Sequence, residues 1–192
     1  TNQLASLDVT QNTALTYLNC GTNQLTSLDV TQNIALVELY CHQNQLTVLD
    51  VTQNTALTVL FLWYNQVTDL DVRQNTVLMD LNCHNNELTS LNLKRNVALI
   101  EILCHSNSLT CLNVKNGNND SIVQIIAKWN PALTCIEVDD VAYSTANWTA
   151  VGGQIDAGAT FSNNCNNSCS SPTCADGIQN GDETGVDCGG TI

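Results

Sequence analysis

The chain has 192 residues, of which 18 are acidic and 5 are basic, so its formal net charge is −13. This charge argues against nucleic acids and anionic membrane surfaces as partners, because both attract proteins with a basic surface. No apolar run approaches the roughly 20 residues of a membrane-spanning helix, so we expect no membrane insertion. The sequence enters in mid-repeat at Thr1 without a signal peptide. We therefore expect a mature or excised piece of a larger secreted or cell-surface precursor.

Residues 1–114 repeat with a period of 21 residues. One apolar column consists of Leu4, Leu25, Leu46, Val67, Leu88 and Leu109. One polar column consists of Asn12, Asn33, Asn54, Asn75 and Asn96. A fixed period of this length predicts stacked coils, because a single unit cannot bury its own apolar side. We expect the leucine columns to form the core and the asparagine columns to bond main-chain groups at the corners.

Each unit contains two segments in which apolar side chains lie two residues apart. Such spacing places both side chains on one face of an extended segment. Each half-unit therefore predicts one short strand, and stacked coils predict parallel ladders with a spacing of about 4.8 Å.

The unit reads L-x-x-L-x-C-x-x-N-x-L-x-x-L-D-V-x-x-N-x-x, as in residues 15–35. This pattern resembles the leucine-rich repeat, in particular the nested bacterial class called IRREKO, in which one 21-residue unit holds two half-repeats. The resemblance implies a β-rich solenoid that is a right-handed coil of short parallel strands. It also implies a protein partner, with a glycan as the second possibility.

The repeat breaks after Val114, where residues 115–129 are inserted. We expect a short helix behind Asp120 and Ser121 as N-caps, because the apolar residues have helical spacing at Ile122, Val123, Ile125, Ile126 and Trp129. The repeat resumes at residues 130–133, which echo residues 12–15. Residues 130–161 should cap the core with Tyr143, Trp148, Ile155 and Phe161. The predicted solenoid thus covers residues 1–161.

The cysteines fall into two groups. Four share one core column, which Leu62 completes, and should behave as small buried hydrophobic residues: Cys20, Cys41, Cys83 and Cys104. The others lie in the C-terminal half, where an oxidising compartment would pair them. We predict a Cys135–Cys165 disulfide, which leaves Cys111 as a free thiol or a partner for the tail. A zinc site at Cys165 and Cys169 is disfavoured, because no second pair has matching spacing.

Residues 162–173 have the Asn, Ser and Pro content of a linker. Residues 174–192 resemble a cysteine-bounded acidic module of secreted bacterial proteins, cut short at its end. We predict that Cys174 pairs with Cys188. The only cofactor we consider is calcium, which prefers oxygen ligands such as those of Asp176, Asn180, Asp182, Glu183 and Asp187.

The repeat also contains an acidic column, which consists of Asp8, Asp29, Asp50 and Asp71 and is continued by Asn92 and Asn113. Stacked carboxylates repel each other unless they are tied down or share a cation. We favour side chains that accept hydrogen bonds from nearby N–H groups over a calcium ladder.

The segment around each L-x-C strand varies from coil to coil, whereas most other positions barely change. It holds every histidine and five of the nine aromatic residues. Exposed aromatic clusters with a polar rim mark contact surfaces. We therefore predict a binding strip at Glu38, Tyr40, His42, Phe61, Trp63, Tyr64, Asp80, His84, Glu101 and His105. The alternative is that Phe61, Trp63 and Tyr64 only pack on one another.

No nucleophile elbow, phosphate loop or paired catalytic carboxylates occur in the sequence, so we do not expect an enzyme. The predicted function is a secreted or surface module that binds a protein or a glycan through its strand face. The alternative is a building block of a filament or adhesin, which self-associates end to end through uncapped solenoid ends. We also expect the histidines to respond near pH 6.

Overall fold

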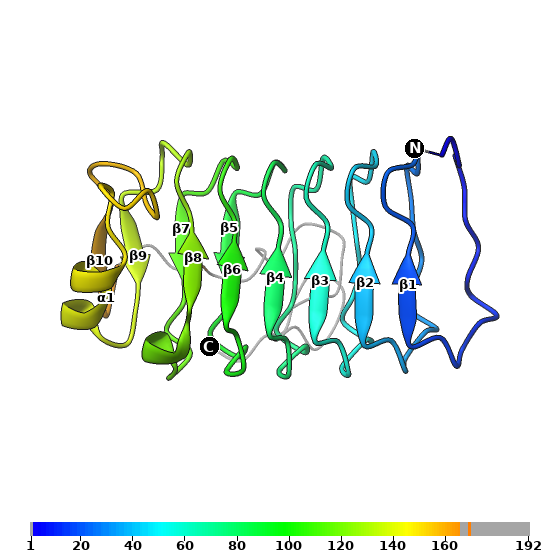
Figure 1. The fold of residues 1–192 in the computed structure, drawn as a ribbon, viewed down its shortest axis with the longest axis horizontal. Helices are drawn as coiled ribbons and strands as arrows, with labels where there is room; N and C mark the ends of the chain where they lie inside the picture. Colours follow the sequence, from blue (N-terminus) through cyan, green and yellow to red (C-terminus); the bar gives the residue numbers. More distant parts are fainter. Residues whose placement is uncertain (1, 166–168, 170–192) are drawn as a thin grey trace, which may run out of the picture.

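The computed structural model describes residues 2–165 and residue 169. These residues form a solenoid whose coils lie side by side along the long axis of the molecule (Figure 1). Each coil contributes short parallel strands in register with the next coil, as the repeat predicts.

The first half-units form a six-stranded parallel sheet, here called sheet A. Its strands, in order, are β1 (Tyr17–Asn19), β2 (Glu38–Tyr40), β3 (Val59–Phe61), β4 (Asp80–Asn82), β6 (Glu101–Leu103) and β8 (Gln124–Ile126). The middle residue of every strand from β2 onward is buried, and its two neighbours point outward. Sheet A therefore has one face in the core and one face toward solvent.

The second half-units form a shorter parallel sheet, here called sheet B. Its strands are β5 (Ser90–Asn92), β7 (Cys111–Asn113), β9 (Cys135–Glu137) and β10 (Thr160–Ser162). The prediction of a strand in every half-unit is wrong for the first four coils, in which the corresponding segments are not paired in a sheet. Sheet B begins where Asn92 replaces the aspartate of the acidic column. Charge alone does not account for this boundary, because Asp80 and Glu101 are direct neighbours in sheet A and their strands still pair.

The aspartates of this column bond their own turns. Asp8 Oδ1 accepts from the N–H of Thr10 at 3.0 Å, and Asp29 and Asp50 accept from Thr31 and Thr52 in the same way. Asp71 accepts from Arg73, with which it also forms a salt bridge of 2.7 Å. The structure thus supports the turn interpretation of these aspartates.

The core is a stack of leucine, valine and cysteine columns. Leu39, Leu60 and Leu81 are fully buried, and each such side chain contributes roughly 1.5–3 kcal/mol. The four column cysteines Cys20, Cys41, Cys83 and Cys104 are buried free thiols, as predicted.

The asparagine columns join neighbouring coils. The Nδ2 of Asn54 donates to the carbonyls of Val30 and Asn33 in the preceding coil, both at 2.9 Å. In the second column, Asn44 Oδ1 accepts from the N–H of Leu25 at 3.0 Å. Both columns therefore supply partners for corner groups that no strand serves.

The predicted helix over residues 115–129 is wrong. The insert contains a single 3-10 turn, η1 (Asn119–Ser121), and then strand β8, which extends sheet A. Ile122 and Ile125 continue the core columns of Leu99 and Ile102, so their spacing belongs to a seventh coil with two inserted residues. Asn130 Oδ1 accepts from the N–H of Leu109 at 3.0 Å. Asn130 therefore continues the column of Asn107 and not that of Asn12.

A cap closes the end of the core beyond β8 and β9. The only α-helix of the described residues, α1 (Val141–Asn147), lies in this cap, at the end of the solenoid far from β1 (Figure 1). Trp148 and Ile155 are buried, and Tyr143 and Phe161 pack against the core, as the sequence predicts. The short helix thus exists, but it comes later in the chain than predicted.

Two disulfides fasten the cap to sheet B. Cys135 of β9 bonds Cys165, which confirms the predicted pair. Cys111 of β7 bonds Cys169, so Cys111 is the partner of the tail and not a free thiol. These bonds leave no thiolate pair at Cys165 and Cys169 for zinc. They also attach the start of the predicted linker to the solenoid. The predicted Cys174–Cys188 pair and the calcium ligands lie outside the described residues.

Candidate functional site

The outer face of sheet A carries a row of stacked aromatic and imidazole rings, here called the ring row: His42, Trp63, His84 and His105. The ring centroids of His42 and Trp63 are 4.4 Å apart with an interplanar angle of 14°. Trp63 and His84 are 5.5 Å apart at 5°, and His84 and His105 are 4.3 Å apart at 9°. The strand register sets this spacing, because each ring follows its strand by two residues.

Gly21 and Trp129 bound the ring row. Gly21 holds the equivalent position one coil before His42, and any Cβ there would collide with the His42 ring. The glycine therefore lets His42 lie against the main chain. At the other end, Trp129 meets His105 edge-on with ring centroids 5.7 Å apart. The Lys128 ammonium lies 4.3 Å from the centroid of the Trp129 ring.

A second set of rings lies beside the ring row, within the strands themselves. Tyr17 and Tyr40 have ring centroids 5.5 Å apart, and Tyr40 meets Phe61 edge-on at 5.1 Å. The Tyr40 hydroxyl donates to Glu38 Oε2 at 2.8 Å. This hydrogen bond is the main reason that the pKa of Tyr40 is raised to about 12. The tyrosine thus holds the Glu38 carboxylate on the same face.

Tyr64 and Trp129 occupy the left-handed backbone region, with φ of 53° and 58°. They share this conformation with the equivalent residues of the other coils, for example Asn85. A bulky residue in this region is strained unless its surroundings hold it there. The solenoid holds Tyr64 through its N–H, which donates to the carbonyl of His84 at 3.1 Å. The result is two half-exposed rings at the edge of the ring row, 52% exposed for Tyr64 and 58% for Trp129.

The histidines of the ring row are neutral at physiological pH. Burial lowers the pKa of His42 and that of His105 below the usual 6.5. Burial, together with the neighbouring His105, lowers the pKa of His84 to about 4. The expected response near pH 6 therefore shifts downward, and for His84 it falls near pH 4, because stacking between other rings removes water from the imidazoles.

The tautomers of these neutral rings follow from their partners. His84 Nδ1–H donates to Asn82 Oδ1, since an amide oxygen only accepts. The Nδ1 atoms of His42 and His105 are buried and have no hydrogen-bond partner among the described residues. The tautomer with the proton on Nε2 is favoured for both rings, because it leaves no buried N–H without an acceptor. The row can thus offer both donors and acceptors to a partner.

The face is acidic at the opposite edge of the strands, where Glu38, Asp80 and Glu101 are half-buried. These three side chains start β2, β4 and β6 and therefore share one column. Burial raises the pKa of Asp80. Of the five basic residues, only Lys128 comes from a segment of this face.

The structure brings the ten predicted strip residues together on one face and adds two rings to them: Tyr17, which the sequence placed in the variable segment but not among the site residues, and Trp129, which it missed. Tyr17 extends the second set, and Trp129 extends the ring row. The helix interpretation of the insert hid Trp129. The signal that identifies it is the downstream Asn130, which aligns Trp129 with Ser106. The alternative that Phe61, Trp63 and Tyr64 only pack on one another is partly right, because the ring centroids of Trp63 and Tyr64 are 5.5 Å apart. The parallel stacking, however, joins rings of successive coils.

The described residues hold neither a candidate metal site nor a candidate membrane-spanning helix. Within residues 2–165 and at Cys169, no three metal-ligating side chains cluster. No described helix combines the length and apolar character needed to cross a bilayer.

The fold is that of a leucine-rich-repeat solenoid, and comparisons with solved structures agree. The functional domain of InlJ from Listeria monocytogenes, whose structure is described as including a cysteine ladder, is 30% identical over 70% of this chain, with a TM-score of 0.59. An internalin, inlF, of the same species is 22% identical over 76% of the chain, with a TM-score of 0.56. A leucine-rich-repeat protein of Leptospira interrogans is 23% identical over 68%, with a TM-score of 0.53.

This chain spans only part of each of these structures. It covers 33% of the InlJ chain, 43% of the inlF chain and 38% of the Leptospira chain. The last two identities show a shared fold alone. No protein-family model matches the sequence, and no curated protein matches it.

Proposed function

We propose that this chain is a non-enzymatic binding module of a secreted or cell-surface protein, and that it recognises a protein partner through the outer face of sheet A. The observation that carries the proposal is the ring row itself. Core packing of a coil needs only the inward residues, so a stack of rings on the outer face has no role in burying the solenoid core. Disulfides in the cap and the bacterial leucine-rich-repeat neighbours support an extracellular setting.

The chemistry of the face defines the partner. Flat rings from His42 to Trp129 offer apolar area, and the imidazoles offer hydrogen bonds without charge. The column of Glu38, Asp80 and Glu101 offers negative charge at one edge. A protein surface that carries apolar side chains beside arginine or lysine fits this arrangement. A glycan is the second candidate, because exposed Tyr64 and Trp129 rings also suit stacking on sugar rings.

The central ring provides the test. Trp63→Ala should weaken binding by more than about 2 kcal/mol, roughly 30-fold, because buried aromatic anchors dominate interfaces. We would immobilise the chain, screen it against arrays of purified extracellular proteins and of glycans, and measure affinities for each hit. Trp63→Phe should retain most of the affinity, since it keeps a ring in the stack.

Val48→Ala is the matched control. Val48 is 67% exposed but belongs to a second half-unit, away from sheet A. Its loss should leave binding unchanged. Thermal unfolding of each variant separates binding from folding. A Trp63→Ala variant that is folded and binds each hit like wild type would refute the proposal, and array hits would distinguish protein from glycan.

The self-association alternative makes a different prediction. Mass measured by light scattering should stay constant with concentration for a binding module, and should rise for a building block. Growth that persists in Trp63→Ala would favour end-to-end contacts over contacts of the ring row.

A further inference from the structure

The basic residues of the chain are unevenly placed, because four of the five lie on one edge of the solenoid. They belong to the second half-units of three successive coils, and Arg73, Lys94 and Lys115 hold the same repeat position. Lys94 follows β5 and Lys115 follows β7 by two residues, and the register of these strands places the two lysines on neighbouring coils. Equivalent residues of adjacent coils are about 4.8 Å apart. This surface is here called the basic edge: Arg73, Lys94, Arg95 and Lys115.

The charge of this part of the solenoid reverses from coil to coil. The first three coils carry the aspartates of the acidic column there. In the fourth coil, Arg73 binds Asp71 in the 2.7 Å salt bridge. Asn92 and Asn113 replace the aspartates in the next two coils, and Glu137 restores a carboxylate one strand later. The fifth and sixth coils therefore present positive charge in a chain whose net charge is −13, with carboxylates on both sides.

The start of the C-terminal tail is fastened beside the basic edge. The Lys115 ammonium donates to the carbonyl of Asn163 at 3.0 Å. Asn92 Nδ2 donates to the carbonyl of Cys169 at 3.1 Å, and a disulfide joins Cys169 to Cys111 of β7. Cys169, the last described residue, therefore lies next to the basic edge.

We propose that the basic edge binds the acidic C-terminal segment of this same chain, residues 176–187, through ion pairs. The segment lies outside the described residues, and its four carboxylates are those of Asp176, Asp182, Glu183 and Asp187. Lys94 and Arg95, which are both exposed, are its main partners. Asp176 follows Cys169 by seven residues, so an extended connection spans at most about 25 Å. The basic edge is two coil spacings long, about 10 Å, so the segment can reach all of it.

The disulfide of Cys169 makes this binding intramolecular. One exposed ion pair is weak, but a tethered segment acts at a high effective concentration, and several pairs act together. Asp69 and the acidic column repel the segment from the first four coils. The bound segment thus lies along the later second half-units. It leaves the ring row, which belongs to the first half-units, open to a partner.

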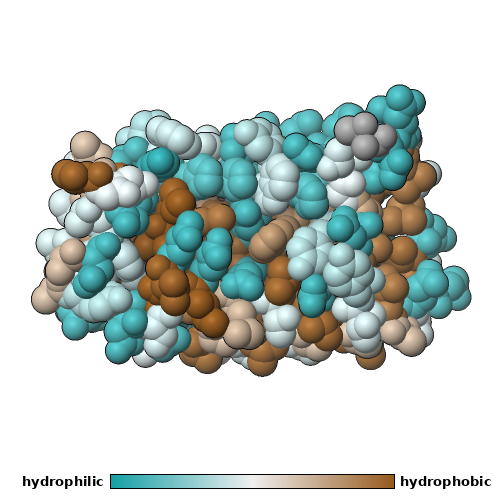
Figure 2. Space-filling view, in the orientation of Figure 1, coloured by the Kyte–Doolittle hydropathy of each residue, from teal (hydrophilic) through white to brown (hydrophobic). Residues whose placement is uncertain are grey.

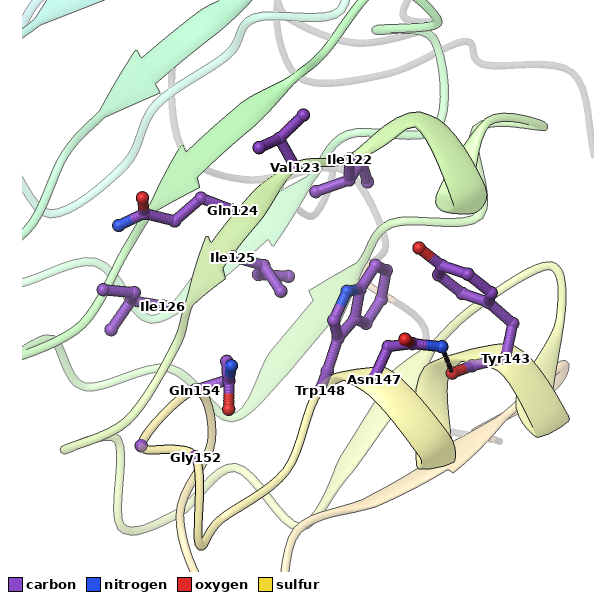
Figure 3. A pocket seen from close by; sticks show the side chains of 11 residues that line it. Ile122, Val123, Gln124, Ile125, Ile126, Tyr143, Asn147, Trp148, Gly152 and Gln154 are labelled. Carbon is purple, nitrogen blue, oxygen red and sulfur yellow. Dashed lines mark hydrogen bonds between the residues drawn. The ribbon is translucent and has the colours of Figure 1, made fainter.

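The β8 end of sheet A offers an acidic segment less positive charge. Apolar side chains gather around this end in Figure 2. The pocket between β8 and the cap is lined by uncharged residues, and Figure 3 shows Trp148 pointing toward Ile125 within it. Lys128 is the one basic residue outside the basic edge, and its ammonium lies over the Trp129 ring at 4.3 Å from the centroid. The basic edge therefore offers the strongest attraction for the segment.

Glu183 reports the binding, because it is the only glutamate after Glu137. We would treat the folded 192-residue chain with a glutamyl endopeptidase and follow cleavage after Glu183 by mass spectrometry. A synthetic peptide of residues 178–187 measures the protease activity under each condition. Lys94→Glu and Arg95→Glu should each speed the cleavage by about threefold, and together by about tenfold, because each replaces an attraction by a repulsion. Salt at about 0.5 M should speed cleavage of the native chain relative to the peptide, because it screens exposed ion pairs.

Lys128→Glu is the matched control, since it makes the same change in charge away from the basic edge. It should leave the cleavage rate unchanged. Asp176→Lys, which is distant from the cleavage site, should speed cleavage in the native chain. Combined with Lys94→Glu it should slow cleavage again, because the exchanged charges attract. Thermal unfolding confirms that each variant is folded.

Equal cleavage rates in the native chain and in the Lys94→Glu, Arg95→Glu double variant would overturn the proposal. So would an equal effect of Lys128→Glu, which would make net charge the cause. If the rates are equal and an added polyglutamate peptide binds the native chain but not the double variant, the basic edge belongs to an external acidic partner. Trp63→Ala should leave the cleavage rate unchanged, so the tail and the proposed partner face are tested separately.

Discussion

A histidine that lies between two other rings titrates differently from a histidine in water. His84 has Trp63 on one side and His105 on the other, and its Nδ1–H bonds Asn82. Protonation would place a charge in a partly dehydrated stack beside a second imidazole. The folded solenoid therefore favours the neutral imidazole of His84, so the free energy of unfolding depends on pH.

We predict that the chain loses stability as the pH falls from about 6.5 to about 4. The unfolded histidines bind protons near their usual pKa of 6.5, whereas folded His84 does so only near its pKa of about 4. Between these values the unfolded state holds more protons, so stability falls with decreasing pH. Thermal unfolding across this range measures the loss, and proton NMR of the imidazoles measures the pKa values. A folded pKa of His84 at or above 6.5 would contradict the prediction.

His84→Phe is the control, because it keeps a ring in the stack and removes the titration. Its stability should depend less on pH between 6.5 and 4. The aspartates act in a lower range. Hydrogen bonds from the side chains and N–H groups of Thr10 and Thr31 lower the pKa values of Asp8 and Asp29, so their contribution is lost only below the usual 3.8. Asp80, whose pKa is raised, acts in the opposite sense.

The buried asparagines connect each coil to the preceding one through side-chain hydrogen bonds. Asn54 is fully buried at a corner, where its Nδ2 serves two carbonyls of the preceding coil. No strand pairing reaches these carbonyls, since each lies outside the three-residue strands of sheet A.

We predict that Asn54→Ala destabilises the fold by about 1–3 kcal/mol, because it removes two buried hydrogen bonds between coils, each contributing about 0.5–1.5 kcal/mol. The two carbonyls keep their main-chain donors, the N–H groups of Asn33 and Leu36. Chemical denaturation measures the free energy of unfolding. Gln53→Ala is the control at the same corner, where the side chain is exposed, and should change stability by less than about 0.5 kcal/mol. Equal effects of the two substitutions would show that the asparagine bonds contribute little.

The elements that the sequence predicts well are those that repeat. Strand β3 and its ring Trp63 could be placed because four similar coils surround them and fix which positions face inward. Strand β8 could not, because two inserted residues shift the register and Ile122, Ile125 and Ile126 fit helical and strand spacing equally well. The same register shift hid the place of the Trp129 ring beside the ring row. The sequence does not show that the early second half-units lack paired strands, because their apolar spacing is the same as in the later coils.

The protonation state of the histidines also could not be predicted from the sequence. The column of His42, His84 and His105 predicts a row, and the row exists. Their pKa values depend on how closely the rings stack, and that distance is set by side-chain rotamers and by Gly21. The Cys135–Cys165 bond was predictable because both cysteines bracket one returning segment, whereas the partner of Cys111 depended on where the chain runs after Cys165.

The whole molecule behaves as a one-dimensional stack, in which each coil contacts only its neighbours. Its two ends differ within this chain. At the β10 end, the cap and two disulfides cover the core. At the β1 end, Leu4 is 43% exposed, whereas its equivalents Leu25 and Leu46 are fully buried. Opening should therefore begin at the β1 end.

The four column thiols report this opening. Burial raises the pKa of Cys20 to about 11 and that of Cys104 to about 12, and it raises the pKa of Cys41 and of Cys83 as well. At pH 8 these thiols are protonated, and a reagent reaches them only when a coil opens. Their alkylation rates therefore measure how easily each coil separates.

We predict that alkylation follows the order of the coils in the 192-residue chain, with Cys20 fastest, Cys41 next, and Cys83 and Cys104 slowest. Cys20 should react at least about tenfold faster than Cys104, which corresponds to about 1.4 kcal/mol of opening free energy. Pulsed alkylation under non-reducing conditions, followed by peptide mass spectrometry, gives the four rates, and the chain unfolded in guanidinium gives the reference in which all four thiols are accessible. One common rate would mean that the coils open only together, and a faster Cys104 would mean that the cap is the weaker end.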